Sequence, residues 1–315
     1  RINAEHYYLV INASNVEKDW DWLNAVNNGD VLIDFERPWL QPEAKATLRN
    51  LKDPKEGERQ RVDVALQGPA SLETLQALTD DPATKAALAR IRRTDLIECE
   101  LAGIPLVVAR TGYTGESWGF EILVHPDQLE DLWRAILDAG EPLGVVPAGL
   151  ACRDSTRIEA GLPLYGHELA GDFDISPIEA GFPGYVKYHK PFFVGRKALL
   201  LQEKDREREL IRFRVEDKNV RRPCTGDPVV DKRGKHIGVV TSCSIDVEKS
   251  LVGLAIVEKR YNEAETPIAI FPLHGKSLDE ALLKRNRVSL PIKATVLTRF
   301  PVKGKAQPAW AKGGD

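Results

Sequence analysis

The sequence predicts an α+β protein that ends in a separate β domain, and three observations support this. Its 315 residues exceed one ordinary domain, so two or three units are expected. Helical and strand patterns with antiparallel hairpins alternate as far as the charged run Glu203–Arg208. Beyond that run, short alternating strands separated by turns are typical of a small β-barrel or sandwich.

The N-terminal part predicts two strands with a helix between them. The apolar run Tyr7–Asn12 is typical of a strand, and a serine or asparagine cap then precedes an amphipathic helix over Asp19–Val26. Val31–Arg37 predicts a short strand, and the proline-containing stretch Pro38–Gln60 predicts a surface connection with one helical turn. Because the chain starts with arginine and contains no methionine, we expect the sequence to be N-terminally incomplete.

The middle of the chain predicts strands, helices and one hairpin. Val62–Ser71 is a strand that ends in a glycine-proline turn. Two helices follow, and Ile97–Thr111 then alternates around a turn at Gly103, which indicates a hairpin. A further strand and an amphipathic helix with a glycine stop come next. The helices are expected at Ser71–Asp80, Asp81–Ile91 and Pro126–Gly140, and the strand at Glu121–Pro126.

Six short strands are predicted in the C-terminal part. Each is an apolar or alternating run bounded by turn residues, so together they indicate a β domain that begins near residue 205. They are Leu210–Val215, Pro228–Asp231, His236–Ile245, Leu251–Val257, Thr266–Phe271 and Ile292–Leu297.

Composition limits the classes of partner. With 44 basic and 47 acidic residues the net charge is −3, which provides no global field for nucleic acid, so small-molecule partners are expected. No apolar run approaches the roughly 20 residues that span a bilayer, and no membrane partner is expected. The four cysteines are too few and too scattered for a disulfide framework or a CxxC metal pair. A cytoplasmic protein is predicted.

Two polar, glycine-containing runs are the candidate ligand sites. In Arg110–Glu121 the glycines either make a tight hairpin or let the backbone approach a flat ligand, whose paired donors the Glu121 carboxylate could accept. In the second run, Arg153–Glu168, Arg153 and Arg157 lie four apart on one predicted helical face. They either form internal ion pairs, with Asp154 and Glu159 available as partners, or face a carboxylate-bearing ligand, and composition does not choose between these interpretations.

Other residues carry weaker signals. The six histidines show no metal-ligand spacing, so no metal site is predicted and each is expected at the surface or hydrogen-bonded internally. No phosphate-binding loop, dinucleotide fingerprint or nucleophile elbow is present. Cys243, in the sequence TSCS, is expected to be a buried thiol. The histidines are His6, His125, His167, His189, His236 and His274.

A series of motifs resembles, in the same order, the aminomethyltransferase family, whose type member is the T-protein of the glycine cleavage system. The resemblance covers residues 1 to about 257, and these motifs are long and unusual in combination. They read YLVINASNVEKD, VALQGPAS, RTGYTGESWGFEI, GLACRDSTRIEAGLPLYGHEL, SPIEAG, FFVGRKAL and IGVVTS.

The resemblance implies a folate-binding fold of three domains arranged like a clover leaf, with a C-terminal β-barrel domain. On this basis residues 1–60 are the remainder of a middle α+β domain, 61–204 a folate-binding α+β domain, and 205–315 the barrel. It also implies a transferase that moves an aminomethyl or methyl unit from a small donor, or from a lipoylated carrier protein, to tetrahydrofolate. Neither the donor nor the oligomeric state is predicted.

Site residues follow from the same resemblance where motifs match. Glu121 looks like the carboxylate that holds the pterin ring of folate, and Tyr113 looks like its neighbour. Arg153 is similar to the arginine near the glutamate tail. The remaining matches are Asn12, Val10 and Tyr8, which resemble a strand lining the pterin pocket, and Arg222, which resembles an arginine in the third domain.

Departures from the family pattern keep other interpretations open. The family's catalytic aspartate would precede residue 1, so this chain alone is expected to be inactive. Gly184 stands where a tryptophan is usual, and TSCSIDVEKSL differs from the TSGxxSP pattern of the T-protein. One alternative is a non-catalytic folate-binding protein like the iron–sulfur assembly relatives, although their KGCYxGQE cysteine is absent. Another is the folate domain of a dimethylglycine or sarcosine oxidase.

Overall fold

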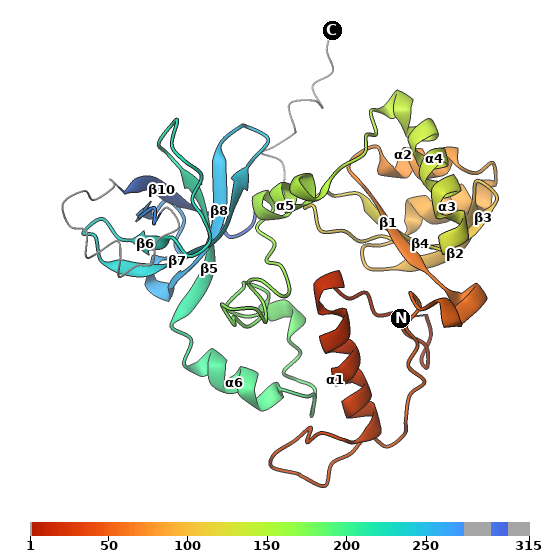
Figure 1. Ribbon diagram of the computed structural model, residues 1–315, viewed down its shortest axis with the longest axis horizontal. Helices are drawn as coiled ribbons and strands as arrows, with labels where there is room; N and C mark the ends of the chain where they lie inside the picture. Colours follow the sequence, from red (N-terminus) through yellow and green to blue (C-terminus); the bar gives the residue numbers. More distant parts are fainter. Residues whose placement is uncertain (1, 274–290, 302–315) are drawn as a thin grey trace. The chain divides into compact units, whose positions relative to one another are not determined.

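The computed structural model describes residues 2–273 and 291–301, and the chain divides into two compact units (Figure 1). The first unit comprises Arg1–Val10 and Glu43–Arg153, and the second comprises Ile11–Pro42 and Asp154–Asp315. The three-domain division at residues 60 and 204 stays a prediction. Each unit has its own hydrophobic core.

The first unit is built on a four-stranded antiparallel sheet with the strand order β1-β4-β3-β2. Its strands were all predicted, including the hairpin between β2 and β3, whose turn places Ala102 and Gly103 at φ 52° and 74°. The strands are β1 Val62–Gln67, β2 Leu96–Leu101, β3 Ile104–Ala109 and β4 Gly119–Val124.

Three helices, each at a predicted position, cover one face of this sheet. They are α2 (Ser71–Ala77), α3 (Pro82–Arg90) and α4 (Leu129–Gly140). Their apolar side chains join alternate residues of the strands in one buried cluster, and the other strand residues, among them Glu121 and Val107, lie on the opposite face. The cluster includes Leu75, Leu88, Leu132, Phe120 and Ile122.

The second unit contains a closed β-barrel with the order β10-β5-β8-β7-β6-β9. All six predicted C-terminal strands are present, and closure pairs every strand on both sides, so no edge is left open. Buried Phe213, Val240 and Ile270 belong to its interior cluster. The strands are β5 Arg208–Val215, β6 Pro228–Val230, β7 His236–Ile245, β8 Leu251–Glu258, β9 Pro267–Ile270 and β10 Ile292–Leu297.

The remaining helices flank these two cores. They are α1 (Val16–Asn28), α5 (Leu150–Glu159) and α6 (Arg196–Lys204). None of the helices within the described residues combines the length and the apolar character needed to cross a membrane. Short 3-10 helices occur at Ala13–Asn15, Pro54–Arg59, Pro126–Gln128, Glu141–Leu143, Pro183–Tyr185 and Lys259–Tyr261.

Two predicted strands, Tyr7–Asn12 and Val31–Arg37, are wrong. The first is irregular and Val10 is 66% exposed, because no described segment pairs with it and an unpaired strand leaves its backbone groups unsatisfied. In the second, the Asp34 carboxylate accepts hydrogen bonds from the backbone N–H groups of Glu36 and Arg37. These local bonds compete with extended pairing and make a turn instead.

Candidate ligand site

Glu121 lies on a central strand of the first unit's sheet, on the face opposite the helices. Its register partners are Ala65 on β1 and Ala109 on β3. Directly opposite residues of antiparallel strands project from the same face, so two methyl side chains flank this carboxylate. The sheet therefore offers a shallow, small-residue surface around one half-buried acid.

Burial raises the pKa of the Glu121 carboxyl, and the nearby negative charge of Asp63 raises it further. The Arg153 guanidinium opposes both by lowering it. Asp63 itself pairs with Lys52 at 3.0 Å, and its carboxyl is half exposed. The two oxygens of the Glu121 carboxylate could accept hydrogen bonds from a ligand with paired N–H donors.

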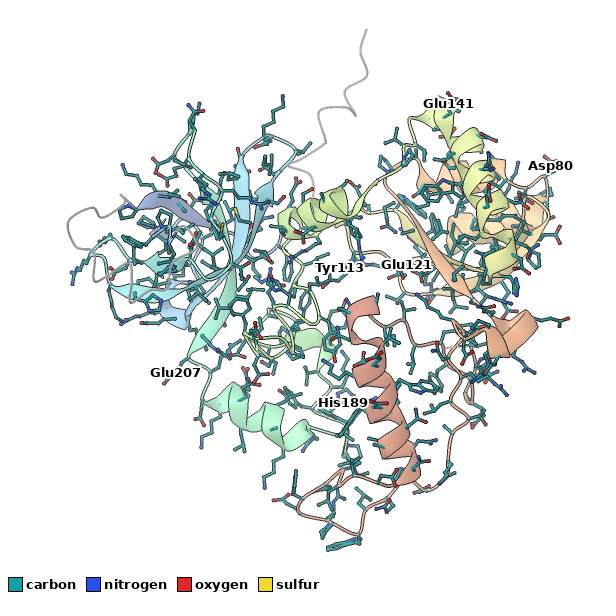
Figure 2. The ribbon with its side chains drawn as sticks, viewed as in Figure 1. Asp80, Tyr113, Glu121, Glu141, His189 and Glu207 are labelled. Carbon is teal, nitrogen blue, oxygen red and sulfur yellow. The ribbon has the colours of Figure 1, made fainter. Side chains whose placement is uncertain are left out.

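The loop from Arg110 to Trp118 joins β3 to β4 and carries Tyr113 (Figure 2). The guanidinium of Arg110 donates to Ile91 O at 2.9 Å and to Ser117 O at 3.2 Å. It also lies over the Trp118 ring, 3.6 Å from the centroid. Because Ala109 pairs with Glu121, the loop leaves the sheet beside that carboxylate. The glycine-containing run is thus a long loop rather than the tight hairpin that was one reading of its glycines, and it lies next to a candidate ligand-binding acid.

The other predicted site residues are divided between the two units. Arg153 belongs to the first unit with Glu121, and it lies close enough to alter that carboxyl's pKa. Tyr8 is half-buried and Val10 exposed in the same unit, but neither lies on a strand. Asn12 and Arg222 belong to the second unit. Asn12 O accepts the Asn15 amide at 3.0 Å, and Arg222 is exposed.

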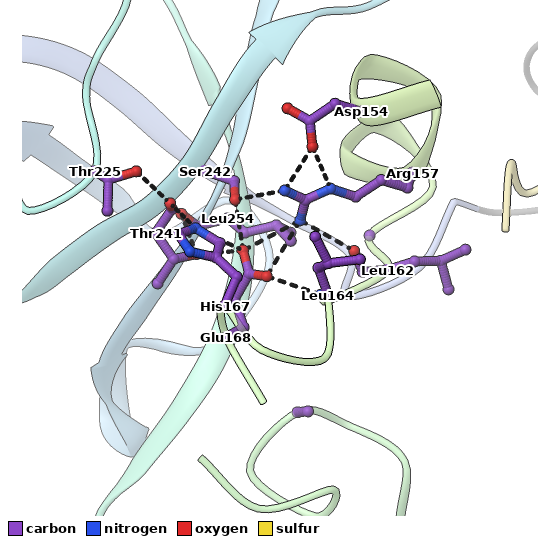
Figure 3. A network of polar contacts seen from close by, with 12 residues as sticks. Asp154, Arg157, Leu162, Leu164, His167, Glu168, Thr225, Thr241, Ser242 and Leu254 are labelled. Atoms are coloured by element: carbon purple, nitrogen blue, oxygen red, sulfur yellow. Dashed lines mark hydrogen bonds and ion pairs between the residues drawn. The ribbon is translucent and has the colours of Figure 1, made fainter. Parts of the chain in front are cut away.

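In the second polar run, Arg157 is an internal ion-pair residue rather than a ligand contact (Figure 3). Its guanidinium donates to Asp154 at 2.8 Å and to Glu168 at 3.2 Å, and its side chain is 5% exposed. Asp154 was a predicted partner. Glu159, the other predicted partner, instead accepts the Val247 amide.

Glu168 is the completely buried centre of this network. The hydroxyls of Ser242 and Thr241 donate to its carboxylate at 2.5 Å and 3.0 Å, and the Leu164 amide donates at 2.8 Å. Burial alone would raise its pKa, but the Arg157 charge and these donors lower it overall. The network therefore fixes α5 and the segment after it against barrel strand β7.

Two further expectations concern thiols and histidines. Cys243 is buried as predicted, and burial raises its pKa to about 12. His167 Nε2 lies 2.8 Å from Thr241 O, so this histidine is hydrogen-bonded internally. His274 lies outside the described residues.

Sequence reasoning missed three residues that shape these sites: Gln67, Asp63 and Glu168. Gln67 was visible only as part of the VALQGPAS strand and Glu168 only as the end of a polar run. Asp63 occupies a polar position in an alternating strand pattern, where a side chain is ordinarily exposed to solvent. Their roles depend on contacts with residues far away in sequence, such as Thr114 for Gln67 and Ser242 for Glu168.

This architecture defines a class of protein that mixes helices and sheets. It has a closed six-stranded barrel, and it carries a half-buried acid beside a glycine-rich loop. A family model described as the GCVT N-terminal domain matches residues 1–190. The chain is 38% identical over 294 residues to an aminomethyltransferase of Lysinibacillus sphaericus, across 91% of this chain and 72% of that protein. An aminomethyltransferase of Shouchella clausii is 39% identical over 288 residues, across 90% and 70%.

The fold is also found in a solved structure, that of glycine cleavage system aminomethyltransferase T from Bartonella henselae. The TM-score is 0.59 at 27% identity, and the match covers 76% of this chain. It spans 59% of the solved chain, less than two thirds of its length. The chain belongs to the aminomethyltransferase family.

Proposed function

We propose that this protein is a tetrahydrofolate-dependent transferase that moves an aminomethyl or methyl unit from a donor to tetrahydrofolate. The donor is a small amine or methylated compound, or a group on a lipoylated carrier protein. The observation that carries the proposal is Glu121, a half-buried carboxylate with a raised pKa between two alanines, in a chain of the aminomethyltransferase family.

The chemistry of this acid fits the pterin ring of tetrahydrofolate. An amino-pyrimidine edge presents two parallel N–H donors, and a carboxylate presents two acceptor oxygens in matching geometry. Ala65 and Ala109 leave room for a flat ring beside Glu121. The Arg153 guanidinium suits the carboxylates of the glutamate tail. Tyr113, Tyr8 and Val10 are proposed as further contacts within the first unit, and Asn12 and Arg222 are proposed separately as ligand-binding residues of the second unit.

In this proposal the protein's residues bind and orient. Glu121 fixes the orientation of the ring. The N–H donors of the ligand stabilise the charged form of the Glu121 carboxyl, so binding lowers the pKa of Glu121. When bound, tetrahydrofolate supplies the N5 atom that takes up the one-carbon unit.

Binding is the decisive first experiment, because these residues are proposed as binding residues. Calorimetric titration with tetrahydrofolate under anaerobic conditions should give a dissociation constant between about 1 µM and 1 mM. Glu98→Gln, an exposed acid on edge strand β2, is a matched control that should leave the affinity unchanged. Absence of heat and of competition by a pterin fragment would remove folate from the proposal.

Donor chemistry distinguishes the alternatives. The protein would be supplied with tetrahydrofolate and either an aminomethylated lipoyl carrier, or dimethylglycine or sarcosine together with a two-electron oxidant, because turning an N-methyl group into a methylene unit is an oxidation. Formation of methylene-tetrahydrofolate from the carrier supports the aminomethyl reading, and formation only from the methylated amines supports the oxidase-domain reading. Tight folate binding without turnover of any donor supports the non-catalytic one.

A further inference from the structure

The amide of Gln67 contacts the loop that joins β3 to β4 at two places, and strand β4 at a third. Gln67 is the last residue of β1, and its Nε2 donates to Thr111 O at 3.2 Å and to Phe120 O at 3.1 Å. Its Oε1 accepts the Thr114 hydroxyl at 3.1 Å. Both amide hydrogens and the carbonyl oxygen are used, so the side chain is held in one orientation.

Two glycines make room for this amide. A Cβ atom on Gly112 or on Gly119 would overlap the Gln67 side-chain amide, closest to its oxygen. Neither glycine has the positive φ that would by itself favour glycine, whereas Gly115 in the same loop does, at 84°. Gly112 and Gly119 therefore fit this loop because they lack a side chain.

These contacts bear on the geometry of the ligand site. They hold the start and the middle of the loop and the strand just beyond it, with Tyr113 between the anchors at Thr111 and Thr114. Ala109, the last residue of β3 before the loop, pairs with Glu121. A change in the loop's path would therefore move Tyr113 relative to the Glu121 carboxylate.

We propose that Gln67 is a positioning residue that fixes Tyr113 beside Glu121 and thereby sets the affinity of the site for a flat, amino-pyrimidine-like ring. This inference rests on the proposed folate function. The local part of it, that Gln67 holds the loop, does not depend on any ligand.

The test uses two substitutions at Gln67 and a milder one at a partner. Gln67→Glu is nearly isosteric but cannot donate to the two carbonyls, and Gln67→Ala removes all three bonds. Thr114→Val removes only the bond from the Thr114 hydroxyl to Gln67, so it provides a milder test if the Gln67 variants do not fold. Gln76→Glu is the control, because Gln76 is also half-buried in the first unit and donates to Lys85 O at 2.9 Å, away from the loop.

Hydrogen exchange over residues 110–120 measures the loop directly. Both Gln67 variants should exchange there at least about tenfold faster than wild type, because local opening becomes easier when the anchoring bonds are lost. Gln76→Glu should not change exchange in this segment. Unchanged protection in both Gln67 variants would overturn the anchoring role.

Binding of two folate fragments separates positioning from general destabilisation. Affinity for a pterin should fall about tenfold or more in Gln67→Glu, while affinity for p-aminobenzoylglutamate, which lacks the ring, should stay within about twofold. Equal losses for both fragments, or no loss despite faster exchange, would overturn the positioning role. If wild type binds neither fragment, the folate function fails, and hydrogen exchange still decides whether Gln67 anchors the loop.

Discussion

Arg157 and Glu168 form an ion pair in which both side chains are buried, with Nη1 of the arginine 3.2 Å from Oε1 of the glutamate. Removing one partner of such a pair leaves an uncompensated charge in a place that water does not reach. Glu168 also accepts the Ser242 hydroxyl, so the pair connects α5 to the barrel. It is the structural element of the second unit whose loss should be most easily measured.

Glu168→Gln should lower the free energy of unfolding by about 3–5 kcal/mol, because Arg157 keeps its charge and loses its buried partner. Chemical denaturation followed by circular dichroism measures this. Glu36→Gln is the control, since Glu36 forms an exposed ion pair with Lys197 and should have little effect. The double change Arg157→Met with Glu168→Leu should be less destabilising than Glu168→Gln, and a larger loss would contradict the ion-pair explanation.

The stability contribution of Glu168 should depend on pH. Its pKa is lower in the folded state than the ordinary value of 4.5, so the unfolded state binds more protons in the window between the two values. The contribution is therefore fully present above about pH 4.5 and is lost as pH falls through the folded pKa. Denaturation at a series of pH values should show the difference between wild type and Glu168→Gln shrinking in acid. A difference that stays constant there would contradict the pKa assignment.

Glu121 should titrate in the opposite sense. Its pKa in the folded state is raised above 4.5, so between pH 4.5 and the raised pKa the ligand-free folded state binds more protons than the unfolded state. The free energy of unfolding therefore falls as pH rises between these two values. Asp63→Asn removes a like charge and should lower the Glu121 pKa toward its ordinary value. A carboxyl NMR titration measures this directly.

Lys52 provides the control for that measurement. Lys52→Gln removes the cation paired with Asp63 and leaves the Asp63 charge in place. It should not lower the pKa of Glu121, since the repulsion from Asp63 is then less compensated. A fall equal to that of Asp63→Asn would show that the Asp63 charge is not responsible for the shift.

Glu121→Gln should weaken tetrahydrofolate binding by about 1.5–3 kcal/mol. A neutral amide replaces the charged acceptor, and the NH2 group of the amide then faces an N–H donor of the ligand. Calorimetric titration beside Glu98→Gln gives the comparison. A change of a few tenths of a kcal/mol, equal to that of the control, would place Glu121 outside the site.

Arg153→Ala should weaken binding of polyglutamylated folate more than binding of a truncated folate without the tail. The arginine is proposed to pair with tail carboxylates, which only the longer ligand supplies. Arg134→Ala, at an exposed position on α4 paired with Glu130, is the control. Equal losses for the two ligands would make Arg153 a residue that acts through Glu121 or the scaffold.

The sequence by itself determined most of the secondary structure, because the local spacing of apolar residues reflects which face of each helix or strand is buried. The hairpin around Gly103, the amphipathic helix α4 and the six barrel strands are of this kind. The same alternation failed at Tyr7–Asn12, where no described segment pairs, and at Val31–Arg37, where Asp34 bonds to its own backbone. Motif order also determined the family.

Tertiary structure alone decided the roles of individual polar residues, because burial and charge depend on neighbours that are distant in sequence. Arg153 and Arg157 are equivalent in the sequence pattern, yet Arg157 is enclosed with Glu168 and Ser242 while Arg153 stays exposed near Glu121. Gln67 became visible only through its bonds to Thr111 and Thr114. A polar residue's type limits what it can do, and its enclosure determines which of those roles it performs.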